Sequence, residues 1–203
     1  MTRVEVETPH GTARAELHSA SEGRAALLLG HGAGGGFGAE DLICATRTAT
    51  VAGVHVALVE QPYRVAGRRA PAPARQLDAA WLSVAEDLGQ RWFPELPLIF
   101  GGRSSGARVA CRTAEEGGAS AVVCLAFPLH PPGRPDRDRG AELDAVEVPT
   151  LVVQGDRDPF GEPAPASNRE VVLVPGDHAL RADTSAVSRA VAEWLGRVLR
   201  LID

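Results

Sequence analysis

One serine stands between glycines where an apolar run meets a helical segment, and this arrangement constrains the fold more than any other feature. Residues 102–106 read Gly-Arg-Ser-Ser-Gly, with Ser104 at the centre. Residues 96–100 form an apolar run typical of a buried strand, and residues 107–111 continue with a helical pattern. The glycines permit a tight strand-to-helix turn that larger side chains would obstruct. The pattern predicts an exposed Ser104 hydroxyl near the N-terminal amides of the helix.

Apolar runs alternate with helical segments along the rest of the chain. Strands are expected where apolar residues are continuous or alternate with polar ones, and helices where they recur every three or four positions. The expected strands are residues 4–7, 13–17, 25–29, 54–59, 96–100, 121–125, 150–153 and 171–174. The expected helices are residues 40–52, 77–88, 187–199 and one that includes residues 107–111 and ends at Gly117-Gly118. This order predicts an α/β fold, with a mostly parallel sheet flanked by helices and an N-terminal antiparallel hairpin.

Length and composition indicate an ordinary globular chain. With 203 residues, 44% of them hydrophobic, we expect a single domain over residues 1–203 with a sizeable core. The irregular segment 127–148 is too short for several helices, so no large cap is expected. The net charge of -5 argues against nucleic acid as a partner. All 21 basic residues are Arg, which excludes Schiff-base lysine chemistry.

The lack of a recognisable targeting signal and the expected state of the cysteines favour a cytoplasmic location. No apolar stretch approaches the roughly 18 residues that would span a membrane, and the N-terminus lacks a signal-peptide core. The three cysteines, Cys44, Cys111 and Cys124, lie in apolar or helical contexts and are expected to be buried thiols. Trp92-Phe93 and the final helix could form a homodimer interface, although oligomeric state is not readable from the sequence.

An acid and a base follow Ser104 in the chain, each just past an apolar run. Asp158 follows residues 150–153, and His178 follows residues 171–174. A serine hydroxyl needs a base within hydrogen-bond reach to act as a nucleophile, and that base needs an acid to orient it. The order Ser, Asp, His therefore predicts a catalytic triad.

Other acids and another histidine compete for these roles. Asp156 lies closer to the strand end than Asp158, and Asp177 directly precedes His178. His130 follows a strand end and is a candidate to line a substrate pocket, but it precedes the acid in the chain. Asp158 is favoured over Asp156 as the acid, and His178 over His130 as the base.

The motif and the order of these residues resemble the α/β-hydrolase superfamily over nearly the whole chain. The chain looks most like the small lidless branch around dienelactone hydrolases. The resemblance implies that Ser104 is the nucleophile, with an oxyanion hole formed by the backbone amides of Ser105 and Ala33, or Gly34 in place of Ala33. It implies hydrolysis of a carboxylic ester or thioester of a small acyl substrate, without a metal or an organic cofactor. His31 would brace the oxyanion loop.

Two alternative functions remain open. Gly30, Gly32 and Gly35 also match the dinucleotide-binding pattern, with Glu60 near the expected ribose-binding position. That interpretation leaves Ser104 and its partners unexplained. The chain also resembles a neighbouring family of hydrolase-like proteins, some of which act as scaffolds in chromatin complexes. A binding protein without efficient turnover is therefore the main alternative.

Arginines cluster around the predicted site. Arg64 and Arg103 each lie near a predicted strand end, and Arg68-Arg69 follow Arg64. A guanidinium group at such a place can orient an anionic group of a substrate. The alternative is that these arginines brace loops or form surface ion pairs.

Overall fold

The computed structural model describes residues 1–202, whose eight strands form one sheet in the order β1-β2-β4-β3-β5-β6-β7-β8. The strands are β1 (Thr2–Thr8), β2 (Gly11–His18), β3 (Ala25–Gly30), β4 (Val54–Glu60), β5 (Leu98–Arg103), β6 (Ala121–Leu125), β7 (Thr150–Gly155) and β8 (Arg169–Val174). Strand β2 runs antiparallel to both β1 and β4, and the pairs from β4 to β8 are parallel. The predicted hairpin and mostly parallel sheet are confirmed.

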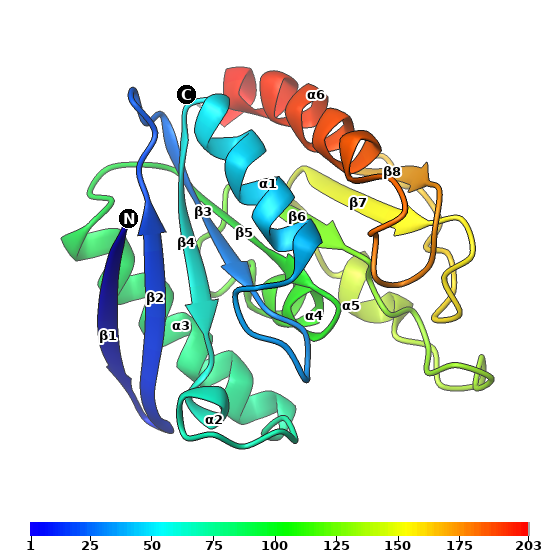
Figure 1. Cartoon of the computed structure of the whole chain (residues 1–203), viewed down its shortest axis with the longest axis horizontal. Helices are drawn as coiled ribbons and strands as arrows, with labels where there is room; N and C mark the ends of the chain where they lie inside the picture. Colours follow the sequence, from blue (N-terminus) through cyan, green and yellow to red (C-terminus); the bar gives the residue numbers. More distant parts are fainter. Residues whose placement is uncertain (203) are drawn as a thin grey trace.

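Helices cover both faces of the sheet (Figure 1). They are α1 (Glu40–Val51), α2 (Pro62–Val65), α3 (Ala74–Arg91), α4 (Ser105–Thr113), α5 (Gly140–Asp144) and α6 (Thr184–Ile202). Helices α1 and α6 contact each other over one face, and α3 and α4 contact each other over the opposite face. Crossover helices between parallel strands thus supply the α3/α4 layer, and the crossover helix α1 together with the C-terminal helix α6 supplies the other.

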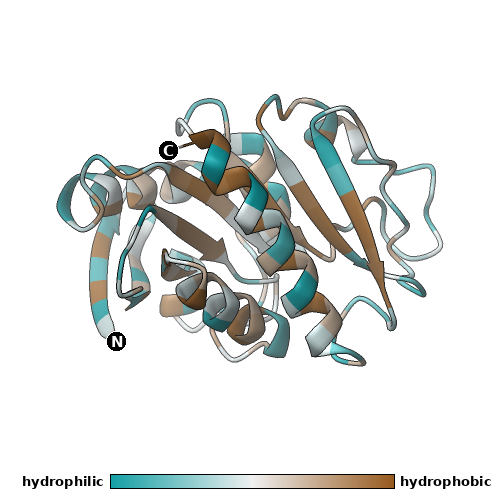
Figure 2. Ribbon diagram, turned by 90° about the horizontal axis from the view of Figure 1, so that it is seen from above, coloured by the Kyte–Doolittle hydropathy of each residue, from teal (hydrophilic) through white to brown (hydrophobic). Residues whose placement is uncertain are grey.

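Strand β3 shows why the inner strands are continuously apolar. Ala26 and Leu28 belong to the core under α3 and α4, whereas Ala25, Leu27 and Leu29 belong to the core under α1 and α6. Successive side chains of a strand point to opposite faces, so a strand between two helical layers must be apolar at every position. Hydropathy along the ribbon follows this arrangement, with brown inner strands and helices of mixed colour (Figure 2).

The carboxyl ends of the parallel strands bring the predicted site together. Strands β3, β5, β7 and β8 run in the same direction, so the loops that follow them lie along one edge of the sheet. In parallel sheets this edge is where ligands bind. The glycine-rich loop, Ser104, Asp158 and His178 each follow one of these four strands.

Some boundaries differ from the sequence-based expectations. Strand β5 continues past residue 100, because Gly101, Gly102 and Arg103 pair with β6. Glycine is depleted in strands on average, so this extension was not expected from the sequence. Helix α4 ends at Thr113, four residues before Gly117. Helices α2 and α5 were not expected, because four or five residues are too few to show a helical period.

The structure has no large cap, as predicted. Between β6 and β7 the chain contains α5 as its helix and otherwise runs as turns and loops. None of the helices within residues 1–202 has the length and apolar character needed to cross a membrane. Cys111 and Cys124 are buried as expected. Cys44 is only partly buried, because its Sγ faces the hydroxyl of Ser188 on α6 rather than the apolar core.

Candidate active site

Ser104 occupies a strained turn between β5 and α4. Its backbone φ is 53° and its ψ is -110°, a conformation that non-glycine residues rarely adopt. Its amide donates to the carbonyl of Leu125 in β6 over 2.9 Å, which helps to hold this conformation. The predicted strand-to-helix turn is therefore present.

The flanking glycines are required by close backbone approaches. A Cβ atom at Gly102 would lie 2.6 Å from the carbonyl carbon of Gly106 and 2.7 Å from the carbonyl oxygen of Gly30. A Cβ atom at Gly106 would collide with the same Gly30 oxygen. The turn at Ser104 thus depends on the absence of side chains at these positions.

The structure brings Ser104, His178 and Asp158 into one hydrogen-bonded chain. The Oγ atom of Ser104 lies 2.8 Å from Nε2 of His178, and Nδ1 of His178 lies 2.8 Å from Oδ2 of Asp158. With the proton on Nδ1, the ring donates to Asp158 and Nε2 accepts from the serine hydroxyl. This is the geometry that a serine nucleophile requires.

Burial differs along this chain of three residues. The side chain of Asp158 is 1% exposed and that of His178 is 15% exposed. The second carboxylate oxygen, Oδ1, accepts from the amide of Phe160 over 2.8 Å. The Phe160 ring also stacks on the imidazole, with centroids 4.0 Å apart and planes 29° apart. The acid is thus fixed and shielded from water, while the base is reachable from solvent.

The competing acids have other partners. Asp156 accepts from the amide of Gly176 over 2.8 Å, and Asp177 accepts from the amide of Ala179 over 2.9 Å. Both therefore shape the turn that carries His178, and only Asp158 contacts its ring. Among these three acids, the geometry favours the residue predicted from the sequence.

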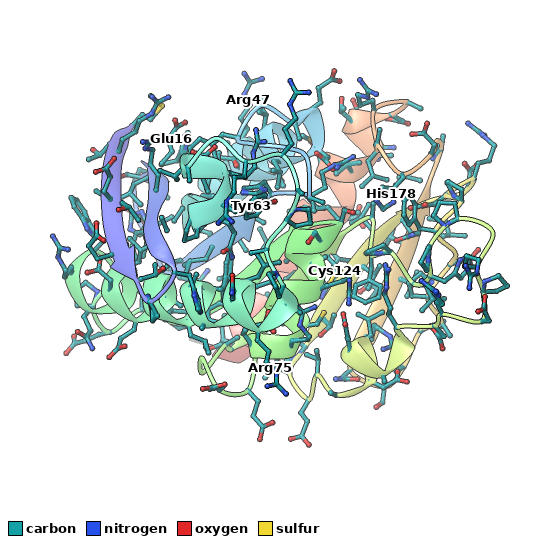
Figure 3. All side chains as sticks on the ribbon, turned by 90° about the horizontal axis from the view of Figure 1, so that it is seen from below. Glu16, Arg47, Tyr63, Arg75, Cys124 and His178 are labelled. Carbon is teal, nitrogen blue, oxygen red and sulfur yellow. The ribbon has the colours of Figure 1, made fainter. Side chains whose placement is uncertain are left out.

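The glycine-rich loop lies against the nucleophile. A Cβ atom at Gly32 would be 3.7 Å from Cβ of Ser104. Ala33 follows Gly32 in this loop, and Ser105 begins α4, so both predicted amide donors belong to segments that border Ser104. The hydroxyl of Tyr63 donates to the carbonyl of Ala33 over 2.7 Å. Tyr63 therefore supports the glycine-rich loop, a role that the sequence did not reveal. It lies at the same edge of the sheet as His178 (Figure 3).

His31 braces the loop, as expected. Its Nδ1–H donates to the carbonyl of Gly32 over 2.7 Å, and its Nε2 accepts from the amide of Gln61 over 3.1 Å. Burial lowers the pKa of His31, and the Gly32 carbonyl opposes this effect only in part. Both ring nitrogens are occupied, so His31 supports the loop through its neutral form.

Arg103 joins three segments of the site. Its Nε lies 2.9 Å from Oδ2 of Asp41, at the start of α1, and its guanidinium also donates to the carbonyl of His178 over 3.3 Å. Burial raises the pKa of Asp41, and the charge of Arg103 acts against this rise. Arg103 also lines an open hollow of about 620 Å³ beside the glycine-rich loop, together with Arg181.

The other predicted substrate-binding residues have partners within their own loops. Arg64 donates to the carbonyl of Arg68 over 3.2 Å, and Nδ1 of His130 lies 3.0 Å from the carbonyl of Pro131. His130 also lies against Gly161 in the loop that carries Asp158. The role of these two residues in substrate binding stays a prediction.

Glu60, which the dinucleotide-binding alternative would place at a ribose hydroxyl, is ion-paired with Arg14 over 3.5 Å.

Comparisons with known proteins identify the family of this chain and support its fold. Residues 23–189 match the family model for an alpha/beta hydrolase domain. Among solved structures, a Xanthomonas campestris protein described as a serine hydrolase without a lid has a TM-score of 0.81 at 19% identity, covering 97% of this chain and 94% of that chain.

Two further structures are similar over nearly the whole chain. Est1E from Butyrivibrio proteoclasticus has a TM-score of 0.78 at 16% identity, covering 98% of this chain and 100% of that one. Dienelactone hydrolase from Anabaena variabilis has a TM-score of 0.74 at 19% identity, covering 95% of each chain. These likenesses support an α/β-hydrolase fold and not the fold of a dinucleotide-binding protein. From the family match and the shared architecture, the chain belongs to the alpha/beta hydrolase domain family.

Proposed function

We propose that this protein is a serine hydrolase that cleaves a carboxylic ester or thioester of a small substrate through an acyl-enzyme on Ser104. The observation that carries the proposal is the continuous hydrogen-bonded chain from Ser104 through His178 to Asp158. The family match and the esterase and dienelactone hydrolase neighbours support hydrolysis as the reaction class.

In the proposed first half-reaction, Ser104 Oγ attacks the carbonyl carbon while His178 Nε2 accepts the hydroxyl proton. The carbonyl oxygen gains negative charge, and the amides of Ala33 and Ser105 stabilise it. His178 then returns the proton to the leaving alcohol or thiol, and the acyl group remains on Ser104. Asp158 stabilises the imidazolium without taking its proton.

In the second half-reaction, a water molecule replaces the leaving group. His178 Nε2 accepts a proton from this water as its oxygen attacks the acyl carbon. Collapse of the second tetrahedral intermediate breaks the bond to Ser104 Oγ and returns the proton to it. The products are a carboxylic acid and the free enzyme, and no metal or organic cofactor takes part.

Labelling with a fluorophosphonate probe, followed by intact-mass measurement, tests the proposal. We expect one adduct on the wild-type protein, because only a serine activated by a base reacts with such a probe. Ser104→Ala should give no adduct. Ser83→Ala is a suitable control, because Ser83 lies in α3 and its hydroxyl donates to the Ala79 carbonyl; this variant should label like the wild type.

The same experiment can contradict the proposal. A folded wild-type protein that gives no adduct would show that Ser104 is not activated, and the scaffold alternative would then be preferred. If the adduct forms, a panel of short esters and thioesters would separate the two substrate classes.

A further inference from the structure

Gln154 lies near the end of β7, four residues before Asp158, and the mechanism above does not use it. Its side chain is fully buried. Its amide nitrogen lies 2.8 Å from Oδ2 of Asp158, 2.8 Å from the carbonyl oxygen of Gly161 and 3.1 Å from that of Phe127. One amide group therefore joins the loop after β6 to the loop that carries the acid.

The carboxylate oxygen that Gln154 contacts is the one that holds the base. Oδ2 of Asp158 lies 2.8 Å from the Gln154 nitrogen and 2.8 Å from Nδ1 of His178. The other oxygen, Oδ1, accepts from the Phe160 amide. Gln154 and His178 thus donate to a single oxygen and share its negative charge.

The orientation of the Gln154 amide follows from its partners. All three neighbouring atoms are acceptors, so the NH₂ group must face them, and a flipped amide would place its oxygen against three oxygens. The side-chain oxygen, Oε1, is buried and has no hydrogen-bond partner among residues 1–202. An unpaired buried acceptor costs stability that an apolar side chain of the same length would not. This cost suggests a functional reason for an amide at this position.

We propose that Gln154 is a positioning residue that acts through Asp158: the hydrogen bond it donates to Oδ2 limits how tightly this oxygen binds the imidazole proton of His178. The inference rests on the proposed function, since it assigns a role within that site. Without the amide donor, Oδ2 has His178 as its remaining donor and holds the imidazolium more strongly. Burial and the Phe160 amide keep the carboxylate in place.

Gln154→Met tests this inference, because methionine has a similar length and cannot donate. The measurement is the pH dependence of the labelling rate with the fluorophosphonate probe. The rate should rise with pH to a midpoint, and in Gln154→Met this midpoint should move up by about one pH unit. Below the midpoint, labelling should slow by up to about tenfold. Apart from Asp158, the charged groups around His178 are Arg103 on its carbonyl and Asp156 and Asp177 on its turn, and all three are the same in both proteins.

Thr150→Val is the matched control. Thr150 is also buried on β7, and its hydroxyl donates to the carbonyl of Val148 over 3.0 Å, away from the triad. This variant should lose stability without moving the midpoint. If Gln154→Met leaves the midpoint unchanged, or moves it to lower pH, Gln154 does not act through Asp158 and the inference is wrong.

A second readout separates this inference from the proposed function. The proton between His178 Nδ1 and Asp158 Oδ2 should give a far-downfield proton NMR signal, which requires no turnover. In Gln154→Met the signal should move further downfield, because the remaining hydrogen bond is stronger. A wild-type protein that does not label would contradict the proposed function alone. An unmoved or lost signal in Gln154→Met would contradict the role of Gln154.

Discussion

At the scale of single residues, three loop acids that look alike in the sequence have different tasks in the structure. Asp156 and Asp177 accept from backbone amides around one turn, and Asp158 contacts the imidazole of His178. The sequence favoured Asp158 through its place in the chain order. It could not reveal Gln154 or Phe160, because their contacts with the triad depend on how separate loops fold back.

Asp158→Asn should reduce the fluorophosphonate labelling rate by roughly 10³- to 10⁴-fold, with little change in structure. An asparagine amide cannot stabilise the imidazolium, and it favours the wrong tautomer of His178. Labelling time courses followed by intact mass give the rate. Asp156→Asn is the control, since asparagine can still accept from Gly176, and its labelling should stay within a few-fold of the wild type. Equal losses in both variants would refute the assignment of the acid.

At the scale of elements, strands and long helices followed from the sequence because burial is continuous along the inner strands and periodic along the helices. Strand β3 and helix α6 were both expected from their apolar patterns, although α6 extends further at both ends than residues 187–199. Helix α5 and the last three residues of β5 were not predicted. A five-residue helix has too few positions to show a period. The glycines of β5 are required by close contacts with β6 at Gly101 and with α4 and β3 at Gly102.

Gly106→Ala tests whether α4 needs this close contact with β3. The added methyl group would meet the Gly30 carbonyl oxygen, so either the elbow must shift or stability must fall. We expect a loss of about 3 kcal/mol or more in the free energy of unfolding, and loss of labelling at Ser104. Urea titration monitored by circular dichroism measures the first effect.

Gly196→Ala is the matched control, because Gly196 lies in α6 and its added Cβ would meet no other part of residues 1–202 within 4 Å beyond its own helix backbone. Here alanine should raise the free energy of unfolding by about 0.5–1 kcal/mol through its helix propensity. If both alanine variants shift stability equally, the close approach at Gly106 is not what holds the elbow.

At the scale of the whole molecule, stability should depend on pH through a group that supports the site. Burial lowers the pKa of His31, so the unfolded chain binds a proton at this residue at a higher pH than the folded chain does. The contribution of His31 to the free energy of unfolding is therefore present in full above the unfolded pKa near 6.5. It is lost as pH falls below that value. The loss should reach up to about 1.4 kcal/mol by pH 5.5.

Urea unfolding at pH 7.5 and pH 5.5 checks this expectation, with His31→Gln as the comparison. Glutamine can both donate and accept but does not titrate, so the variant should lose less stability on acidification than the wild type. An identical loss in both proteins would assign the pH dependence to other groups.

The absence of a large cap has a consequence for how reaction rate depends on the substrate. An enzyme that closes a cap over its ligand expels water by that movement, and residues 1–202 contain no large cap that could close over Ser104. In the proposed reaction, water would therefore be excluded from the reacting carbonyl by the substrate itself, through a non-reacting portion that covers His178 and Ser104. Such a portion would contribute to the rate as well as to binding, so trimming it from a good substrate would slow the chemical step itself.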